Sequence, residues 1–337
     1  MRGCWKARMG WIIILSLLQN TFILAQQERC LKESFRLTLD NDFLNYRGNG
    51  TDRYYTNGMQ VEYSKQQQND KFFGAGILLG AGDESENIAQ WSLTQIMFTP
   101  VNIRDSQVRY HDRPYAGALY LTRGRTTFNN ASNLTVHSEI NIGLIGPFSF
   151  ANDVQTWVHR VIEYTKPRGW NNQIKTDIVI NYNIDASRQI LTGRKLQGDV
   201  QLSSRIGTLF NDLAVGFGIK AGKLCQKADA YQNNLAGVAK GNKDCRKMYF
   251  FSSAQLKLVL ENSLLQGGFI QSFKNGCEDF YHLDESDIKR LLVTYETGVV
   301  ADLTRWRFSV SENFISAEFK TAKTQLFGRI TVIYRFI

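Results

Sequence analysis

The stretch FRLTLDNDFLNYRGNGTDRYYTNGMQVEYS, residues 35–64, predicts two strands joined by a polar loop. Apolar and polar residues alternate from Phe35 to Leu39, so this strand has one apolar and one polar face. The same period of two runs from Met59 to Tyr63. The segment between them is rich in Gly, Asn, Asp and Arg, as expected of a loop that water solvates. The stretch therefore predicts a β-hairpin with an apolar face on each strand.

Oxygen-bearing side chains gather at the end of this hairpin. Asp40, Asn41 and Asp42 close the first strand, and Thr56 opens the second. Carboxylate, amide and hydroxyl oxygens are ligands for Ca²⁺ and not for a soft metal. The alternative is turn chemistry, in which these side chains bond the nearby backbone.

The alternation also ranks the candidate ligands. It points Asp40 and Asp42 to one face of the strand and Asn41 to the other. Asn41 and Asp42 can therefore serve one ion only if the strand twists or bulges there, or if Asn41 contributes its backbone oxygen. Asp42 is the ligand that we expect most, with Asn41 and Thr56 beside it.

Strand patterns continue to the end of the chain, which holds only four prolines. After the hairpin, the predicted strands span residues 91–99, 114–128, 134–147, 173–185, 198–210, 213–224, 248–259, 291–303, 306–315 and 324–336. Their lengths suit tilted strands that cross a membrane. The last segment carries aromatic residues near its end and resembles the closing strand of bacterial outer-membrane barrels, apart from the final Ile337. We therefore predict an all-β fold, a twelve-stranded antiparallel transmembrane barrel, with a large soluble β-sandwich as the alternative.

The first 25 residues predict a signal for export, followed by one barrel domain over residues 26–337. Basic residues precede an apolar run from Trp11 to Leu18, and small residues follow near Ala25. The alternative is an uncleaved membrane anchor, but the run is too short to span a bilayer well. No other window has about 18 uninterrupted apolar residues, so no transmembrane helix is predicted.

Charge and cysteine content are compatible with an exported membrane protein. Loss of residues 1–25 removes three of the 40 Lys and Arg and none of the 31 Asp and Glu, which leaves an excess of positive charge. Such an excess suits a phosphorylated lipid surface, and we expect lipids, not nucleic acid, as partners of a monomer. The cysteines left are Cys30, Cys225, Cys245 and Cys277, an even number that permits disulfides. Cys225 and Cys245 bracket one polar loop, residues 226–244, and are the favoured pair.

One segment, residues 148–165, departs from the strand pattern and predicts a helix. Its apolar residues recur at helical spacing, Ser149 or Asn152 could cap its start, and Pro167 follows its end. Gln155 and His159 stand four residues apart and project toward the same neighbour. Counted from a periplasmic N-terminus, the helix follows the fifth strand and lies at the outer rim, as does the end of the first hairpin.

Together these groups predict an ester hydrolase. A hard cation would polarise the ester carbonyl, and His159 would deprotonate a water molecule. No GxSxG motif argues for a serine nucleophile. The alternative for His159 is a structural or exposed histidine, and His111, His137 and His282 are other candidates for the base.

The same residues belong to a set of motifs that resembles the lipid A 3'-O-deacylase family of the Gram-negative outer membrane. The motifs are LDNDF (39–43), YYTNG (54–58), QIMFTP (95–100), DRPYAG (112–117), IGLIGP (142–147), QTWVHR (155–160) and PRGWNNQ (167–173). They keep the family's order and similar spacing over residues 35–173, whereas the rest of the chain agrees only as barrel strands.

The resemblance implies a twelve-stranded barrel with its active site between the wall and an extracellular helix. It also implies Ca²⁺-dependent removal of the 3'-linked acyloxyacyl chain of lipid A, the lipid anchor of lipopolysaccharide. Position by position, Asp42 would bind Ca²⁺, His159 would activate water, and Asn41, Thr56 and Gln155 would complete the site.

Two features set limits on the resemblance. The family uses a lysine shortly after the TP motif, where this chain has VNIRDSQVR (101–109), so Arg104 or Arg109 would hold a phosphate or sugar oxygen instead. In DRPYAG we expect Arg113 to have a structural role. Two other functions stay open: a non-catalytic barrel such as a porin or adhesin, and a phospholipase-like barrel with a serine nucleophile.

Overall fold

A computed structural model describes residues 33–45, 53–67, 76–82, 85–224, 247–270, 280–303 and 305–336. The predicted export signal, residues 1–25, lies outside these ranges. So do Cys30, Cys225, Cys245 and Cys277, together with the polar loop 226–244.

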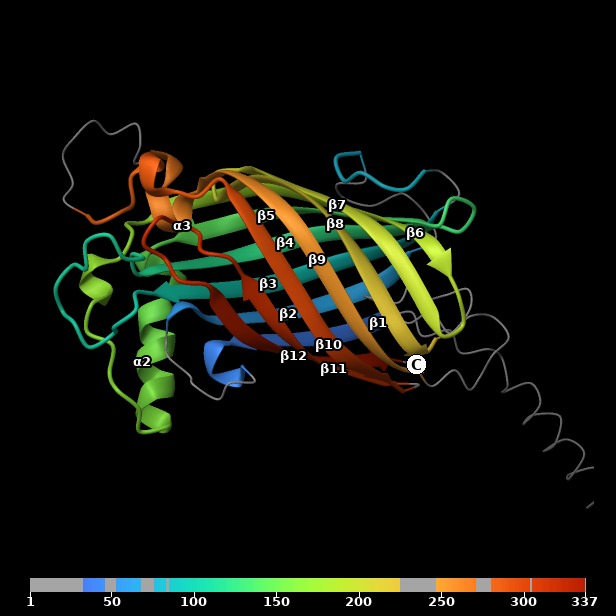
Figure 1. Cartoon of the computed structure of the whole chain (residues 1–337), viewed down its shortest axis with the longest axis horizontal. Helices are drawn as coiled ribbons and strands as arrows, with labels where there is room; N and C mark the ends of the chain where they lie inside the picture. The colour runs from blue at the N-terminus through green and yellow to red at the C-terminus, as the bar shows by residue number, and fades with distance from the viewer. Residues whose placement is uncertain are drawn as a thin grey trace, which may run out of the picture.

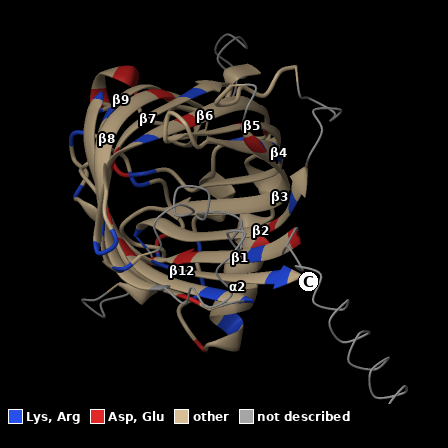
Figure 2. Ribbon diagram, turned by 90° about the vertical axis from the view of Figure 1, so that its right-hand side faces the viewer, with Lys and Arg blue, Asp and Glu red and all other residues tan. Residues whose placement is uncertain are grey.

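The described residues form a closed barrel of twelve antiparallel strands (Figures 1 and 2). The strands are β1 (Glu33–Asn41), β2 (Tyr54–Gln67), β3 (Glu86–Thr99), β4 (Ala116–Asn129), β5 (Leu134–Ile145), β6 (Asp177–Thr192), β7 (Leu196–Gly207), β8 (Phe210–Lys223), β9 (Lys247–Asn262), β10 (Leu291–Asp302), β11 (Trp306–Ile315) and β12 (Gln325–Phe336). Each strand pairs with its neighbour in sequence, and β1 pairs with β12, from Glu33 opposite Phe336 to Asn41 opposite Gly328. The predicted barrel is confirmed, and the β-sandwich alternative is wrong.

The period-two alternation separates an apolar outer wall from a polar lumen. On β4, Leu119 and Leu121 are exposed on the outside, whereas Tyr120 lines a central cavity of about 610 Å³. The cavity is lined mainly by amide, hydroxyl and charged side chains. Exposed Val, Leu, Ile and aromatic side chains recur around the outer wall, as expected where lipid replaces water.

Several strand ends differ from the sequence prediction. β3 begins at Glu86 instead of residue 91, and β6 extends to Thr192 instead of residue 185. After β9 the chain turns into the short helix α3 (Ser263–Gln266), because the Asn262 side chain accepts a hydrogen bond from the Leu264 backbone N–H. Polar residues inside these strands face the lumen, so they weaken the apolar signal without ending the strand.

The predicted helix is present as α2 (Ala151–Val161), shorter than residues 148–165. A 3-10 turn, η2 (Pro147–Ser149), precedes it, and Phe150 at the N-cap has a left-handed backbone with φ of 57°. The expected side-chain cap is therefore wrong, because the Ser149 hydroxyl donates to the Gly146 carbonyl at 2.6 Å. Among the described residues, no helix is both long and apolar enough to cross a membrane.

Helix α2 lies outside the barrel against β3 and β4 (Figure 1). A buried apolar cluster of Met97, Ile103, Tyr115, Ala151 and Trp170 joins it to the wall. Gly117 makes the close approach possible, since a Cβ there would lie 2.5 Å from the Cβ of Ala151 and even closer to the Ser149 hydroxyl. The crowding that the sequence suggested at Gly117 is confirmed.

Candidate active site between the barrel wall and helix α2

The predicted site residues converge on one end of the barrel. β1, β3 and β5 end there, and β2, β4 and β6 begin there, opposite the end at which Glu33 pairs with Phe336. We call this end the α2 rim. In Figure 1 the green helix α2 and the blue segment after β1 both lie at this end. Asp42, Thr56 and His159 are therefore placed at a common rim, as the strand count predicted.

Asp42 leaves the strand and enters a short 3-10 turn, η1 (Asp42–Leu44). Its side chain is buried, and Oδ2 accepts a hydrogen bond of 2.9 Å from the Arg53 backbone N–H. Asn41 caps this turn, with Oδ1 accepting from the Phe43 backbone N–H at 2.8 Å. Asn41 thus performs the turn chemistry considered as its alternative, and the turn carries the Asp42 carboxylate away from the strand alternation.

Asp40 belongs to the lumen and not to this site. Its carboxylate accepts two hydrogen bonds from Arg329, of 2.7 and 2.8 Å, and a third of 2.8 Å from the Tyr55 hydroxyl. A carboxylate with these partners is neutralised inside the barrel. Of the two aspartates at the hairpin end, only Asp42 is at the outer rim.

Thr56 stands at a bulge in β2, between Tyr55 and Asn57, where the register with β3 shifts. Its buried hydroxyl lies 2.7 Å from the Thr99 hydroxyl at the end of β3. Thr99 shares the outer face of β3 with Met97, which packs under α2. The bulge therefore brings the Thr56 oxygen onto the wall surface beside the helix.

Gln155 is buried on the side of α2 that faces the wall. The Trp170 indole N–H donates to Gln155 Oε1 at 2.7 Å. Because an indole nitrogen can only donate, this contact fixes which end of the amide is the oxygen. Among the described residues, no hydrogen-bond partner reaches Gln155 Nε2, so a buried N–H donor remains for a ligand.

His159 lies one turn further along the same side of α2 and is also buried. Its Nδ1 lies 2.5 Å from the Thr165 backbone carbonyl. A carbonyl only accepts, so Nδ1 carries the proton and Nε2 is the basic nitrogen of the neutral ring. The Tyr164 ring packs edge-on against the imidazole, with 5.2 Å between centroids.

The two candidate arginines differ in their surroundings. Arg109 forms ion pairs with Asp105 at 2.5 Å and with Asp112 at 3.2 Å. Hydrogen bonding to Asp105 raises the pKa of Arg109 and binds its charge to the loop. Arg104 is exposed and lies beside the segment after α2, with Nη2 3.5 Å from the Thr165 hydroxyl. Of the two, Arg104 is the one placed near His159.

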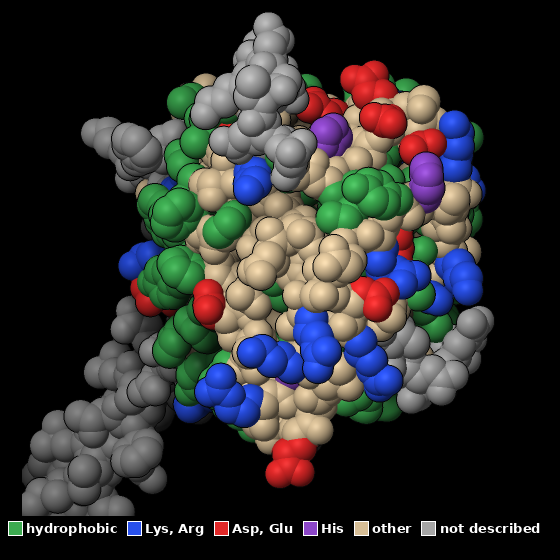
Figure 3. All heavy atoms as spheres, turned by 90° about the vertical axis from the view of Figure 1, so that its left-hand side faces the viewer, with side chains coloured by type: hydrophobic (Ala, Val, Ile, Leu, Met, Phe, Trp, Pro, Cys, Tyr) green, Lys and Arg blue, Asp and Glu red, His purple; other side chains and the backbone are tan. Residues whose placement is uncertain are grey.

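Arg113 has the structural role that we expected. It is fully buried, stacks on the Phe98 ring at 3.9 Å and forms an ion pair with Glu318, between β11 and β12. Burial lowers the pKa of the Arg113 guanidinium. Further contacts join the same loops, including a 2.7 Å hydrogen bond from the Tyr281 hydroxyl to the Asp112 carbonyl. Figure 3 shows that the described loops cover the mouth of the barrel at this end.

Comparison with known proteins identifies the family. The sequence profile described as "Outer membrane protein LpxR" matches residues 11–336. The chain belongs to the LpxR family. It is therefore an outer-membrane protein, and the resemblance found in the sequence motifs is confirmed.

Solved structures agree on the fold. LpxR from Salmonella typhimurium has 20% sequence identity and a TM-score of 0.71, covering 90% of this chain and 100% of that chain. The β domain of the Bordetella autotransporter BrkA has 8% identity and a TM-score of 0.45, over 90% and 99% of the two chains. The translocator domain of NalP from Neisseria meningitidis has 9% identity and a TM-score of 0.43 over both full chains. Among curated proteins, no sequence matches the chain.

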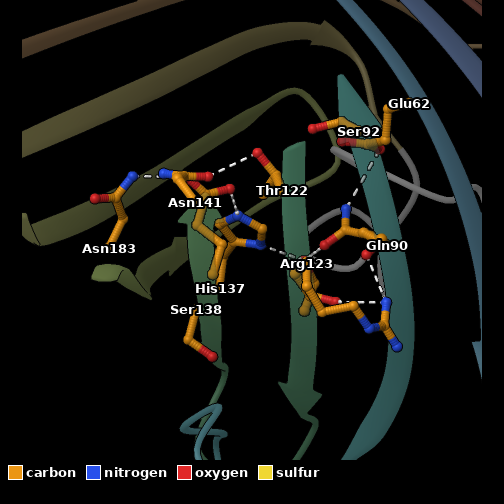
Figure 4. Close-up of polar contacts among 12 residues, drawn as sticks. Glu62, Gln90, Ser92, Thr122, Arg123, His137, Ser138, Asn141 and Asn183 are labelled. Atoms are coloured by element: carbon orange, nitrogen blue, oxygen red, sulfur yellow. Dashed lines mark hydrogen bonds and ion pairs between the residues drawn. The ribbon is translucent and has the colours of Figure 1, made fainter. Parts of the chain in front are cut away.

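The other histidines lie elsewhere in this LpxR-family barrel. His137 faces the lumen in a network that β2, β3, β4, β5 and β6 build together (Figure 4). Its Nδ1 lies 2.8 Å from the Thr126 hydroxyl and its Nε2 3.1 Å from Glu139. His111 and His282 are exposed on loops. Only His159 is buried beside α2 and the wall.

Sequence reasoning missed the residues that hold α2 in place. Trp170 was quoted only within the motif PRGWNNQ, yet it fixes the Gln155 amide. Gln95 projects from β3 and donates from Nε2 to the Ser149 carbonyl at 2.6 Å. Thr99 supports Thr56. These contacts join segments more than 40 residues apart, except for Trp170, so periodicity alone could not reveal them.

Proposed function

We propose that the chain is a Ca²⁺-dependent ester hydrolase that removes the 3'-linked acyloxyacyl chain of lipid A. The observation that carries this proposal is the buried pair Gln155 and His159, held on the wall-facing side of α2 with their proton positions assigned by fixed partners. Family membership supports a lipid of the outer membrane as the substrate.

His159 is the proposed general base. Water attacks the ester carbonyl carbon, and His159 Nε2 takes the proton from that water. The tetrahedral intermediate then collapses, the bond to the sugar oxygen breaks, and the same nitrogen returns the proton to the leaving alkoxide. The products are a fatty acid and a free hydroxyl on the sugar, and no covalent intermediate is needed.

Gln155 is the proposed oxyanion donor. Its Nε2 is buried without a partner among the described residues, and Trp170 holds the other end of the amide. A donor that is oriented before the reaction stabilises the charge that develops on the carbonyl oxygen.

The donor set near η1 fits a hard cation. Asp42 offers a carboxylate, Thr56 a hydroxyl, and Asn41 an amide oxygen with a second lone pair beyond its bond to Phe43. Bound Ca²⁺ would polarise the ester carbonyl and offset the negative charge of the intermediate. The described residues contain no group of three or more His, Cys, Asp and Glu that could hold a metal. With one carboxylate, we expect weak binding, with a Kd of about 10⁻⁴–10⁻³ M.

The test is mass spectrometry of lipid A from cells that express the protein. Wild type and His282→Ala, a matched exposed histidine, should both remove the acyloxyacyl chain. His159→Ala should leave lipid A intact, and chelation of Ca²⁺ in purified outer membranes should stop wild type until millimolar Ca²⁺ is restored. An unchanged acyl pattern with wild type would overturn the activity, and full activity of His159→Ala would overturn the base.

The two other functions have less support. A phospholipase-like barrel needs a serine nucleophile, but the buried Ser149 donates its hydroxyl to the Gly146 carbonyl, away from any histidine contact among the described residues. A porin needs an open mouth, whereas loops cover this one.

A further inference from the structure

Helix α2 has an exposed apolar face that the barrel does not cover. Trp157 and Val161 are 61% and 63% exposed, and Val158 lies exposed beside them. In water, such a face on a short helix would be unfavourable. The face therefore needs an occupant.

The helix divides into three sectors at 100° per residue. Ala151, Gln155 and His159 form the buried sector against the wall. The apolar sector of Trp157, Val158 and Val161 is its neighbour on one side. The polar residues Asp153, Thr156 and Arg160 occupy the remaining sector. Wall, lipid and water would each take one sector, as in helices that lie in a membrane interface.

The apolar sector continues the lipid-facing surface of the barrel. α2 packs on β3 and β4, whose outer faces expose Leu93 and Leu121. Leu93 precedes Gln95 by two residues on the same face, and Gln95 is bonded to the segment that begins α2. The acyl chains that cover the wall would therefore meet the apolar sector without a break.

A cationic cluster adjoins the polar sector. It consists of Arg104, Arg160, Lys166 and Arg168, all exposed, and none of them forms an ion pair within the described part of the chain. The Arg168 backbone N–H donates to the Ile103 carbonyl at 2.9 Å, which holds the two loops together. Figure 3 shows Lys and Arg side chains gathered in one area of this end of the molecule. Clustered cations of this kind bind lipid phosphates.

We propose that α2 lies flat in the outer leaflet, with its apolar sector among acyl chains and the cationic cluster at the phosphates of a phosphorylated lipid. His159 and Gln155 then sit at the depth where acyl esters join the headgroup. The substrate enters sideways from the leaflet, not through the lumen. The position of the helix is independent of the proposed function, whereas the entry of the substrate rests on it.

Quenching of Trp157 tests the position of the helix. The purified barrel is reconstituted in bilayers with bromine on the acyl chains, and the fluorescence lost in Trp157→Phe gives the Trp157 signal. We expect bromine to reduce that signal at least twofold. The matched control is Asp153→Trp in the Trp157→Phe background, which reports on the polar sector and should lose little fluorescence. Equal quenching at both positions, or none at Trp157, would overturn the placement.

A charge variant tests the phosphate contact. Arg160→Gln, Lys166→Gln and Arg168→Gln combined should raise the KM for phosphorylated lipid A about tenfold or more and change kcat little, because they touch the headgroup and not the ester. The KM for dephosphorylated lipid A should not change. The control is Lys320→Gln, an exposed lysine of the same rim that pairs with Asp287. An unchanged KM would overturn the phosphate role. Absence of hydrolysis by wild type would defeat the proposed function, while the quenching result would still decide the helix position.

Discussion

Two glutamine–histidine pairs in this barrel differ in how their polar atoms are satisfied. In the lumen, Gln90 accepts from Thr126 at 2.8 Å and donates to Glu62 at 3.4 Å, while both nitrogens of His137 have side-chain partners (Figure 4). Beside α2, Gln155 has a fixed oxygen and an N–H without a partner among the described residues. Complete satisfaction marks a structural network, and an orphaned buried donor marks a site prepared for a ligand.

The largest expected difference between the pairs lies in the histidines. His159→Ala should lower the rate of lipid A deacylation about 10³-fold, within the usual range for loss of a general base, with unchanged unfolding. His137→Ala should keep at least half of the rate but lose about 1–3 kcal/mol of stability, because Thr126 and Glu139 lose a partner. Hydrolysis rates and urea unfolding followed by tryptophan fluorescence measure the two effects. Equal loss of activity in both variants would remove the distinction.

The glutamines should show a smaller difference of the same kind. Gln155→Ala removes the proposed oxyanion donor and should lower kcat about 10²-fold with little change in KM. Gln90→Ala should leave kcat within about twofold and reduce stability by about 1 kcal/mol. Gln155→Glu separates donor from packing, since it keeps the shape but cannot donate when ionised. If Gln155→Glu matched wild type, the donor role would be refuted.

Two glycines should give the smallest effects. Gly117→Ala places a Cβ against Ser149 and Ala151 and should push the start of α2 outward, at a cost of about 1–3 kcal/mol and a several-fold loss of kcat. Gly124→Ala is the matched change on the lumen side of the same strand. Its Cβ would lie 3.2 Å from the His137 ring, which small shifts can accommodate. Comparable activity of the two variants would show that the seat of α2 tolerates displacement.

Much of the barrel could be predicted from the sequence because one face of each strand must be apolar. Period-two alternation identified the strands, the helical spacing from Val154 to Val161 identified α2, and strand parity brought Asp42 and His159 to one rim. Alternation also separated Asn41 from its neighbours correctly, since Asp40 points into the lumen.

The remainder depended on local departures from that alternation. The η1 turn redirects Asp42, and the bulge after Tyr55 brings the Thr56 hydroxyl onto the outer wall. Neither has a periodic signal, because each inserts an irregular residue into a regular pattern. The Ca²⁺ ligands and the catalytic roles stay predictions for the same reason: they depend on atoms positioned by such irregularities.

The buried Arg113 has a consequence for biogenesis. Its charge is matched by Glu318, which precedes the final strand, so the loop of residues 100–115 can reach its place only after the last hairpin has entered the membrane. A chain stalled before β12 would lack both the seam with β1 and the partner of Arg113. Completion of the barrel and completion of the catalytic surface are therefore the same event, and a half-inserted protein would be unable to attack the membrane that is receiving it.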